Sequence, residues 1–460
     1  MPRIIETELA RDEFSASRRK RCGRVLALAA ATVCSLSVPA RALQPLDVFV
    51  ERAQKVNTDV RVSTALHQQR DAEADRATGS LLPSLQAQGN YTRNQYQVEF
   101  PGNLLGAMTT TPGVPPPPAG NIVVLPHNQL DATFTASVPL IDVGAWERRA
   151  VAQATNEVAR ADLSSMRLDV ARRVSRSYFQ LLANEAVLQS AQRALQLSSE
   201  NMALTTEKRD GGTASELDVQ RARGDVARAE QDVAVATLNV AISRRSLETL
   251  SGIAPEPASE FPSDDLAPEA PLASFLEQVG EVPAVQSARA SRRAAERGAR
   301  AANAAWLPTL SGNFQERVTN APSLTLHNYY YLAQLQAQWR LDATIPANVR
   351  ALQAQAAGAM ARADAARRQV DDAIFNDWHQ VTAAISRARS ARTQVEAASA
   401  AVTLARDRYE GGIATQLDVL QAQQDLFRAD VGRIQADADV AYARTSLRLD
   451  IARPIGDRPR

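Results

Sequence analysis

Residues 409–419 read YEGGIATQLDV, and residues 209–219, 200 positions earlier, read RDGGTASELDV. Glycine can adopt the left-handed backbone that closes a helix C-terminus, so each Gly pair predicts the end of a helix. Ser215 and Thr415 are suitable caps for a following helix, and the Asp three residues further on completes a capping box. Each segment therefore predicts the tip of a helical hairpin. The Gly pairs and the acids are Gly211, Gly212, Gly411, Gly412, Asp218 and Asp418.

The spacing of 200 positions extends well beyond the two tips. Identical residues recur at this distance over about a hundred residues, which indicates an internal duplication rather than chance. The matching residues are Asp142, Gln153, Val170, Gln180, Leu204 and Leu247 in the first copy, and Asp342, Gln353, Val370, Gln380, Leu404 and Leu447 in the second.

The composition favours a helical molecule. Aromatic residues make up 5% and hydrophobic residues 45% of the chain, with many alanines, which suits closely approaching helices. The formal net charge is only +1, and the basic residues are scattered among acidic ones along the chain. Charge therefore gives no indication of a nucleic-acid partner.

Residues 1–42 have the pattern of an export signal. Basic residues 18–21 precede the apolar run 25–38, and an Ala-Arg-Ala cleavage site follows, so Leu43 is the expected first mature residue. Both cysteines fall inside this segment, at Cys22 and Cys34. The mature chain is therefore expected to hold no disulfide and no cysteine ligand or nucleophile. A lipoprotein anchored at the second cysteine is an alternative, although the residues before it match a lipoprotein signal poorly.

Two-residue alternation of apolar and polar side chains occurs in both copies. It covers 85–92 and 130–140, on either side of a Pro- and Gly-rich loop at 101–126, and then 310–314 and 333–341. Four strands are too few to close a barrel alone, but a barrel shared by several subunits would have this apolar outside and Gln-rich inside. A soluble sandwich is the alternative. After the export signal, no apolar run reaches the roughly 20 residues that a membrane-spanning helix needs.

Long helices are predicted between the strands and the tips, at 145–208 and 345–408. At 1.5 Å per residue, each would be about 95 Å long. The helices after the tips, 216–250 and 416–450, carry apolar seams with alternating steps of three and four residues. The last helix has two adjoining seams, which favours a closed ring of helices over a two-stranded rod. An ordinary coiled-coil bundle is the alternative.

The predicted organisation has five segments. They are the export signal 1–42, a first repeat 43–252 that begins with one helix over about 45–80, a Pro-rich crossover 253–283 on the outside of the helices, a second repeat 284–452, and a tail 453–460.

In combination, these features resemble the TolC family of outer-membrane efflux proteins. The resemblance rests on the export signal, the duplicated order of elements, the LP[ST]L junctions at 82–85 and 307–310, the PLID segment at 139–142, and the two tips. It covers nearly the whole mature chain. It implies a mainly α fold with a small transmembrane β part, built from a duplicated helix-strand-strand-helix-helix unit. Three identical subunits would form a 12-stranded β-barrel in the outer membrane, continued by a long periplasmic α-helical barrel.

The resemblance also implies a function and partners. The expected function is that of a passive exit channel in a tripartite efflux system, with a type I protein secretion duct as the alternative. The expected partners are two further copies of the chain, outer-membrane lipid, a periplasmic adaptor at the helix tips, and an inner-membrane pump of RND, ABC or MFS type. No cofactor is expected.

By the same resemblance, the tips form the periplasmic gate. Asp218 and Asp418 match acidic positions that line the entrance, and Tyr409 matches a tyrosine in a constricting hydrogen-bond network. A ring of carboxylates at a narrowing repels itself and attracts cations, so donors from neighbouring helices must hold it closed. The alternative is a purely structural role, with both acids as helix caps and Tyr409 as a packing residue.

The sequence departs from the best-known family member at two gate positions. Ala414 stands where that member has a bridging Arg, and Gln421 stands where it has a second Asp. Arg209 or Arg408 is therefore expected to supply the missing cation. The turns expected to contact the adaptor contain Gly211, Gly212, Ser215, Gly411, Gly412 and Thr415.

Other functional classes fit the sequence less well. An enzyme is not indicated, because the four histidines are dispersed and the Gly pairs lack the Gly-Lys-[Ser/Thr] of a phosphate loop. A periplasmic adaptor would have one helical hairpin rather than two. A secreted coiled-coil scaffold would not need strands with a Gln-rich face. The histidines are His67, His127, His327 and His379.

Overall fold

The computed structural model describes residues 43–101, 121–257, 264–321 and 327–452. The predicted export signal with its cleavage site, most of the Pro-rich loop and the tail lie outside the described residues.

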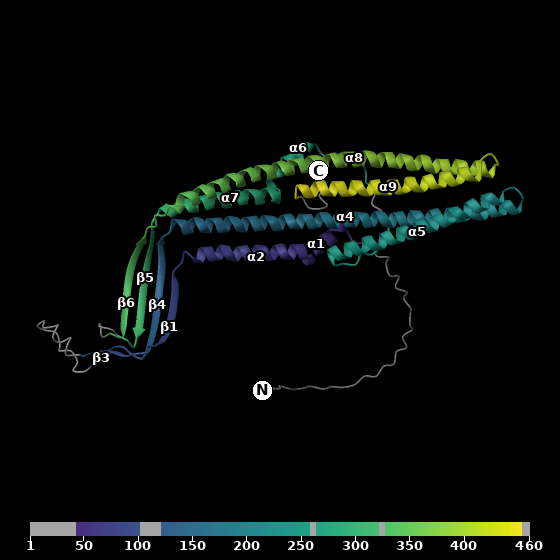
Figure 1. Ribbon diagram of the computed structural model, residues 1–460. Coiled ribbons are helices and arrows are strands. Elements are labelled where there is room, and N and C mark those ends of the chain that lie inside the picture. Colours follow the sequence, from purple (N-terminus) through teal and green to yellow (C-terminus); the bar gives the residue numbers. More distant parts are fainter. Residues whose placement is uncertain (1–42, 102–120, 258–263, 322–326, 453–460) are drawn as a thin grey trace, which may run out of the picture. The chain divides into compact units, whose positions relative to one another are not determined.

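The two copies of the repeat have the same order of elements (Figure 1). The first copy contains α1 (Leu46–Val56), α2 (Thr58–Gly79), β1 (Ser84–Arg93), β4 (Asn128–Ile141), α4 (Val143–Asp210) and α5 (Glu216–Ser251). The second contains α7 (Pro283–Asn303), β5 (Thr309–Thr319), β6 (Tyr329–Gln338), α8 (Thr344–Glu410) and α9 (Gln416–Asp450). The four predicted helices next to the tips are therefore confirmed to within two residues at each end.

The prediction of one helix over 45–80 is wrong. The backbone of Asn57 is extended, with φ −60° and ψ 133°, so α1 ends before it and α2 begins after it. The Asn57 side chain accepts a hydrogen bond of 2.9 Å from the backbone N–H of Asp59, which makes it the N-cap of α2. The capping side chain thus separates two helices that the sequence pattern predicted as one.

The predicted loop at 101–126 is also partly wrong. Near its end lies the strand β3 (Asn121–Leu125), which pairs antiparallel with β2 (Val98–Pro101), a strand that ends at the first residue of the predicted loop. In addition, the predicted strand at 333–341 ends earlier, at Gln338, where β6 stops.

The sheet has the order β1-β4-β5-β6, with all neighbours antiparallel. One row of paired residues contains Leu85, Ala136, Phe314 and Ala333, and the adjacent row contains Ser84, Ser137, Asn313 and Gln334. Since side chains alternate between the faces of a strand, one face of the sheet is apolar and the other polar. The predicted alternation is confirmed across all four strands. Strands β1 and β6 are the two edges.

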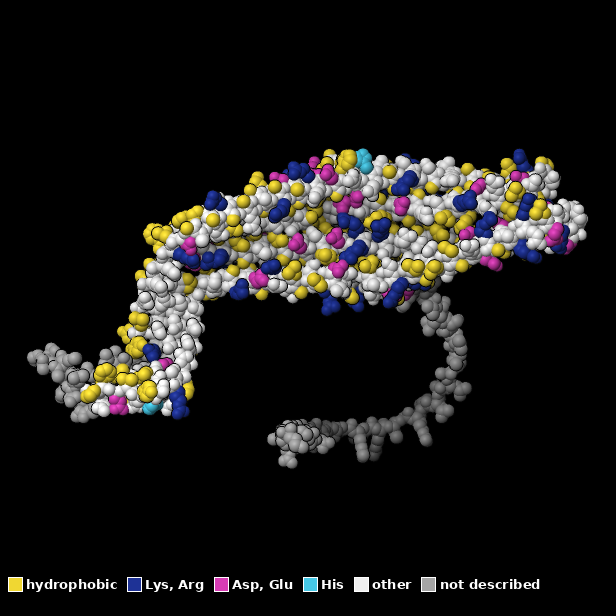
Figure 2. Space-filling model, viewed as in Figure 1, with side chains coloured by type: hydrophobic (Ala, Val, Ile, Leu, Met, Phe, Trp, Pro, Cys, Tyr) yellow, Lys and Arg dark blue, Asp and Glu magenta, His cyan; other side chains and the backbone are white. Residues whose placement is uncertain are grey.

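The helices bury two main apolar clusters. One joins α1, α4 and α5 around Phe49, Leu181 and Leu247. The other joins the crossover to α8 and α9, with Phe275, Ile374 and others at its centre. The helix α7 lies against both α4 and α8, and α4 also lies against α9, so the two copies share one helical body. On the visible face, basic and acidic side chains are intermingled over the helices (Figure 2). None of the described helices has both the length and the hydrophobicity of a membrane span.

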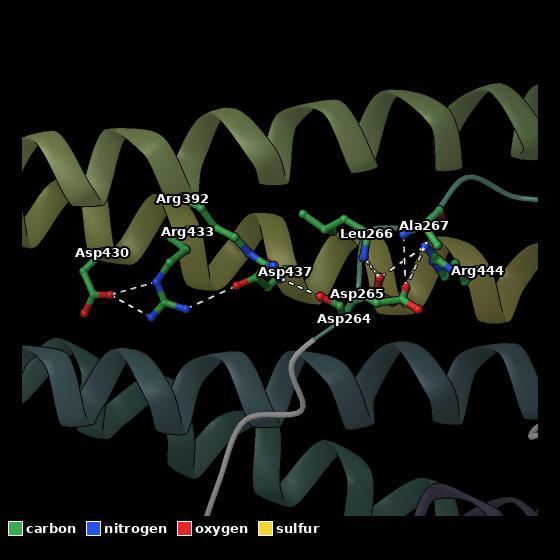
Figure 3. Close-up of polar contacts among 9 residues, drawn as sticks. All are labelled: Asp264, Asp265, Leu266, Ala267, Arg392, Asp430, Arg433, Asp437 and Arg444. Carbon is green, nitrogen blue, oxygen red and sulfur yellow. Dashed lines mark hydrogen bonds and ion pairs between the residues drawn. The ribbon is translucent and has the colours of Figure 1, made fainter.

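The crossover is held against α8 and α9 by a segment that we call the strap, residues 264–270 (Figure 3). Arginine and tryptophan side chains of the two helices donate hydrogen bonds to its backbone carbonyls. The pairs are Arg392 to Asp264 (3.1 Å), Arg389 to Leu266 (2.7 Å), Arg444 to Ala267 (2.6 Å) and Trp378 to Ala270 (2.9 Å). Prolines exclude a continuous helix from the crossover, apart from the short α6 (Leu272–Leu276), so side chains of α8 and α9 satisfy these carbonyls instead.

Candidate functional site: the hairpin tips

Both tips use the same turn. The second Gly of each pair has a positive φ, +77° at Gly212 and +73° at Gly412. A Cβ at either position would meet no atom within 4 Å, so the requirement for glycine comes from the backbone alone. The next two backbone N–H groups donate to a helix carbonyl, that of Lys208 in the first tip (2.8 and 3.1 Å) and that of Arg408 in the second (2.8 and 3.2 Å).

The predicted capping boxes are present in both tips. Asp218 accepts hydrogen bonds from the Ser215 hydroxyl (2.6 Å) and backbone N–H (3.2 Å), and its own N–H donates to the Ser215 hydroxyl oxygen. Asp418 makes the same contacts with Thr415, at 2.7 and 2.8 Å. Hydrogen bonds from the Thr415 hydroxyl and backbone lower the pKa of Asp418. The lowered pKa favours the charged form of Asp418, and both acids fix the starts of their helices, α5 and α9, through the capping boxes.

The two candidate cations do not bind these acids. Arg209 forms ion pairs with Asp210 (2.6 Å) and Glu216 (3.3 Å), both in its own hairpin. Hydrogen bonds from the Arg209 guanidinium to Asp210 and Glu216 raise the pKa of Arg209. Arg408 has an exposed side chain in the last turn of α8. Arg209 thus clamps the first tip turn, and among the described residues neither arginine side chain forms a hydrogen bond or ion pair with the other hairpin.

A lysine that the sequence reasoning missed makes that contact. The Lys208 Nζ donates a hydrogen bond of 3.2 Å to the backbone carbonyl of Tyr409 and lies 4.0 Å from the centroid of its ring. Both residues are half-buried. Composition could have drawn attention to Lys208, because it is one of only three lysines in a chain that otherwise uses arginine as its cationic residue. The Tyr409 ring thus packs against a cation, and its role in a gate stays a prediction.

A small cavity of about 140 Å³ lies beside this contact, between α4, α8 and α9. Tyr409 lines it together with Asn201 and Gln423. The Asn201 Nδ2 and the Gln423 Oε1 are buried there without a hydrogen-bond partner in the protein. Such polar atoms suit bound water, which needs two or more polar partners. Among the described residues, no cluster of three His, Asp or Glu side chains is arranged to hold a metal ion.

A buried acid further along the helices also escaped the sequence reasoning. Asp225 is only 7% exposed, and it accepts hydrogen bonds from Ser198 (2.8 Å) and Gln424 (3.1 Å). It joins α5 to α4 and α9. The sequence analysis expected only apolar seams on the helix that contains Asp225. The polar partners come from helices far away in the sequence, so the heptad pattern alone could not reveal them.

Comparisons with known proteins agree on one fold. The outer membrane efflux protein family matches residues 49–253 and 279–451. A search of curated proteins found no match. Among solved structures, the chain is similar to the outer-membrane channel OprN, with 20% identity and a TM-score of 0.73 over 88% of this chain and 89% of that one. It is similar to VceC from Vibrio cholerae, with 17% identity and a TM-score of 0.72 over 88% and 95% of the two chains. It is also similar to the open state of MtrE from Neisseria gonorrhoeae, with 18% identity and a TM-score of 0.71 over 90% of each chain.

Proposed function

This chain belongs to the outer membrane efflux protein family, and we propose that it is the exit channel of a tripartite efflux system. The family is one of outer-membrane channels that extend into the periplasm, which fixes the location of the chain. In the proposed system, three copies form one duct. A periplasmic adaptor binds the duct at the hairpin tips, and an inner-membrane pump supplies the energy, so the duct itself conducts passively.

The sheet is the observation that supports a shared duct. It has one apolar and one polar face, and in the described part of the chain no strand pairs with the outer edge of β1 or of β6. An exposed edge in a membrane leaves backbone groups without partners, so strands can span the bilayer only in a closed barrel. The two edges run antiparallel to each other, so β1 of one copy can pair with β6 of the next. Four strands in each of three copies close such a ring.

The side chains of the sheet suit a barrel whose outer surface contacts lipid and whose inner surface contacts water. On the apolar face, Tyr331 lies near the start of β6 and Leu335 follows it, and Trp339, eight residues after Tyr331, comes directly after the last residue of the strand. Eight residues at about 3.3 Å each span about 26 Å along the chain, or about 20 Å across the membrane at the usual strand tilt of about 40°, so both aromatic residues fit within an apolar band of roughly 25 Å. On the polar face, Arg317 forms an ion pair of 2.7 Å with Asp131.

At the other end of the duct, the tips are the proposed gate. Asp218 and Asp418 cap the starts of α5 and α9, so three copies would bring six acidic side chains to the entrance. Such a ring favours cations and resists narrowing unless cations or donors compensate its charge. The exposed turn residues Gly212 and Ile413, which lie between the helices of each hairpin, are the surface proposed for the adaptor.

The proposal is tested by three measurements on the mature protein: its native mass in detergent, the membrane fraction in which it is recovered, and its conductance. We expect the native mass of three chains, recovery in the outer-membrane fraction, and discrete conductance steps in a planar lipid bilayer. A monomer without conductance would refute the duct. A conducting trimer that neither binds a periplasmic adaptor nor supports the export of small molecules by a pump would refute the tripartite assignment.

A further inference from the structure

We propose that Lys208 is the tie between the two hairpin tips of one subunit, and that it holds the ring and the backbone carbonyl of Tyr409 rather than its hydroxyl group. The inference rests on the proposed channel function, because it names the contact that must break when the tips separate. It differs from a latch made by a tyrosine hydroxyl and an arginine.

The geometry supplies two attachments for one ammonium group. Its Nζ lies 3.2 Å from the Tyr409 carbonyl oxygen and 4.0 Å from the ring centroid. A cation over the face of a tyrosine ring is attracted by the negative face of the π-system, within a limit of about 6 Å. The attraction needs the ring and not the hydroxyl. Since both residues are half-buried, water screens this contact less than it screens a fully exposed ion pair.

The backbone on both sides fixes the position of the ammonium group. The Lys208 carbonyl accepts the two N–H groups that close the first tip turn, and Thr213 adds a hydroxyl hydrogen bond of 3.0 Å to the same oxygen. The Tyr409 carbonyl accepts the N–H of Gly412 at 3.1 Å in the second tip turn. Lys208 therefore connects the closing turn of one hairpin to the closing turn of the other.

Helix electrostatics favour a cation at this point. Lys208 is in the last turn of α4, and its ammonium group lies beside the last turn of α8. The C-terminal carbonyls of a helix carry partial negative charge and lack partners inside the helix. One ammonium group therefore compensates two helix ends, which Arg209 cannot do because its guanidinium is held by Asp210 and Glu216.

The experiment measures the open probability of single channels at neutral pH for the full-length mature protein. Lys208→Met keeps the length of the side chain but removes the charge, and Tyr409→Leu removes the ring. We expect each to raise the open probability about fivefold or more, the change expected from loss of a partly exposed cation–π contact. Tyr409→Phe keeps the ring and the carbonyl, so it should behave like the original protein. Arg209→Met is the matched control for loss of a positive charge at the same tip and should have a smaller effect than Lys208→Met.

Each outcome decides between the alternatives. If Tyr409→Phe opens the channel as much as Tyr409→Leu, the hydroxyl is the latch and the proposal is wrong. An unchanged open probability in Lys208→Met refutes it as well. Should Lys208→Met fail to assemble, Lys208→Arg provides the test, because the proposal requires a retained cation to keep the channel closed. If the unmodified trimer shows no conductance at all, the channel function fails, a result distinct from failure of the latch.

Discussion

The substitution Arg444→Met should release the strap from α9. Arg444 binds several residues of the strap (Figure 3), and 14% of its side chain is exposed. Its guanidinium donates to the Ala267 carbonyl and forms ion pairs of 3.2 Å with both Asp264 and Glu269. Methionine keeps most of the apolar volume but provides no hydrogen bond. The Glu269 carboxylate, only 6% exposed, would then be left with a weaker partner.

The expected change in the free energy of opening the strap follows from the burial of the Glu269 carboxylate. Removing one partner of a fully buried ion pair costs about 3–5 kcal/mol, because the other charge stays buried without compensation. Arg448 lies 4.0 Å from the same carboxylate and can compensate part of the loss. We therefore expect local opening of the strap to become easier by about 2 kcal/mol, equivalent to about 30-fold faster exchange of its protected amides.

Hydrogen exchange followed by mass spectrometry measures this opening directly. The peptide to follow covers 264–270, where the Leu266 N–H donates to the Asp264 carboxylate at 2.7 Å. Arg448→Met is the matched control, one turn further along α9, and should change the exchange less than threefold because its contact is longer. Equal exchange in the Arg444 variant and the original protein would refute the reasoning, as would equal acceleration by the two variants.

Two further predictions concern backbone strain and pH. Gly412→Ala should destabilise the second tip by about 1 kcal/mol, since φ is +73° there, whereas Gly411→Ala, at φ −76°, should cost less; the thermal unfolding midpoints of the two variants check this. Burial, a hydrogen bond with Asp377 and the charge of Asp377 raise the pKa of Asp450 to about 7, so the folded protein binds this proton more tightly than the unfolded chain. Its contribution to stability is fully present below the ordinary carboxyl pKa and is lost as the pH rises through about 7. Denaturant unfolding at pH 5 and pH 8 should therefore show a smaller loss of stability for Asp450→Asn than for the original protein, and equal losses would contradict the assignment.

The features of the fold that the sequence predicted well are those set by neighbouring residues. The capping box of Ser215 with Asp218 and the left-handed turn at Gly212 depend on a few consecutive positions, so the local pattern was sufficient. Strand alternation was equally readable, because side chains of a strand point to opposite faces in turn. The break at Asn57 was missed although its cause is also local, since an asparagine followed by Thr-Asp is a capping signal within a helical pattern.

Contacts between the two repeats were beyond prediction from the sequence. Lys208 and Tyr409 are 201 positions apart, and their meeting depends on how the two hairpins pack. The same holds for Asp225, whose partners lie on two other helices. The sequence predicted that Arg209 or Arg408 would supply the gate cation, but the Arg209 guanidinium binds Asp210 and Glu216 in its own hairpin. The gate roles of the capping acids stay predictions.

The central claim, that several copies close one barrel, is tested most directly by disulfide trapping between the edge strands. The two native cysteines lie in the predicted export signal, so disulfides in the mature protein would form only between introduced cysteines. Gln88→Cys in β1 is combined in turn with Gln334→Cys, Gln336→Cys or Gln338→Cys in β6, all on the polar face of the sheet. The account predicts that at least one pair, oxidised in intact membranes, yields covalent dimers and trimers and no larger species. Only monomers from every pair, or a ladder that continues beyond three chains, would contradict it.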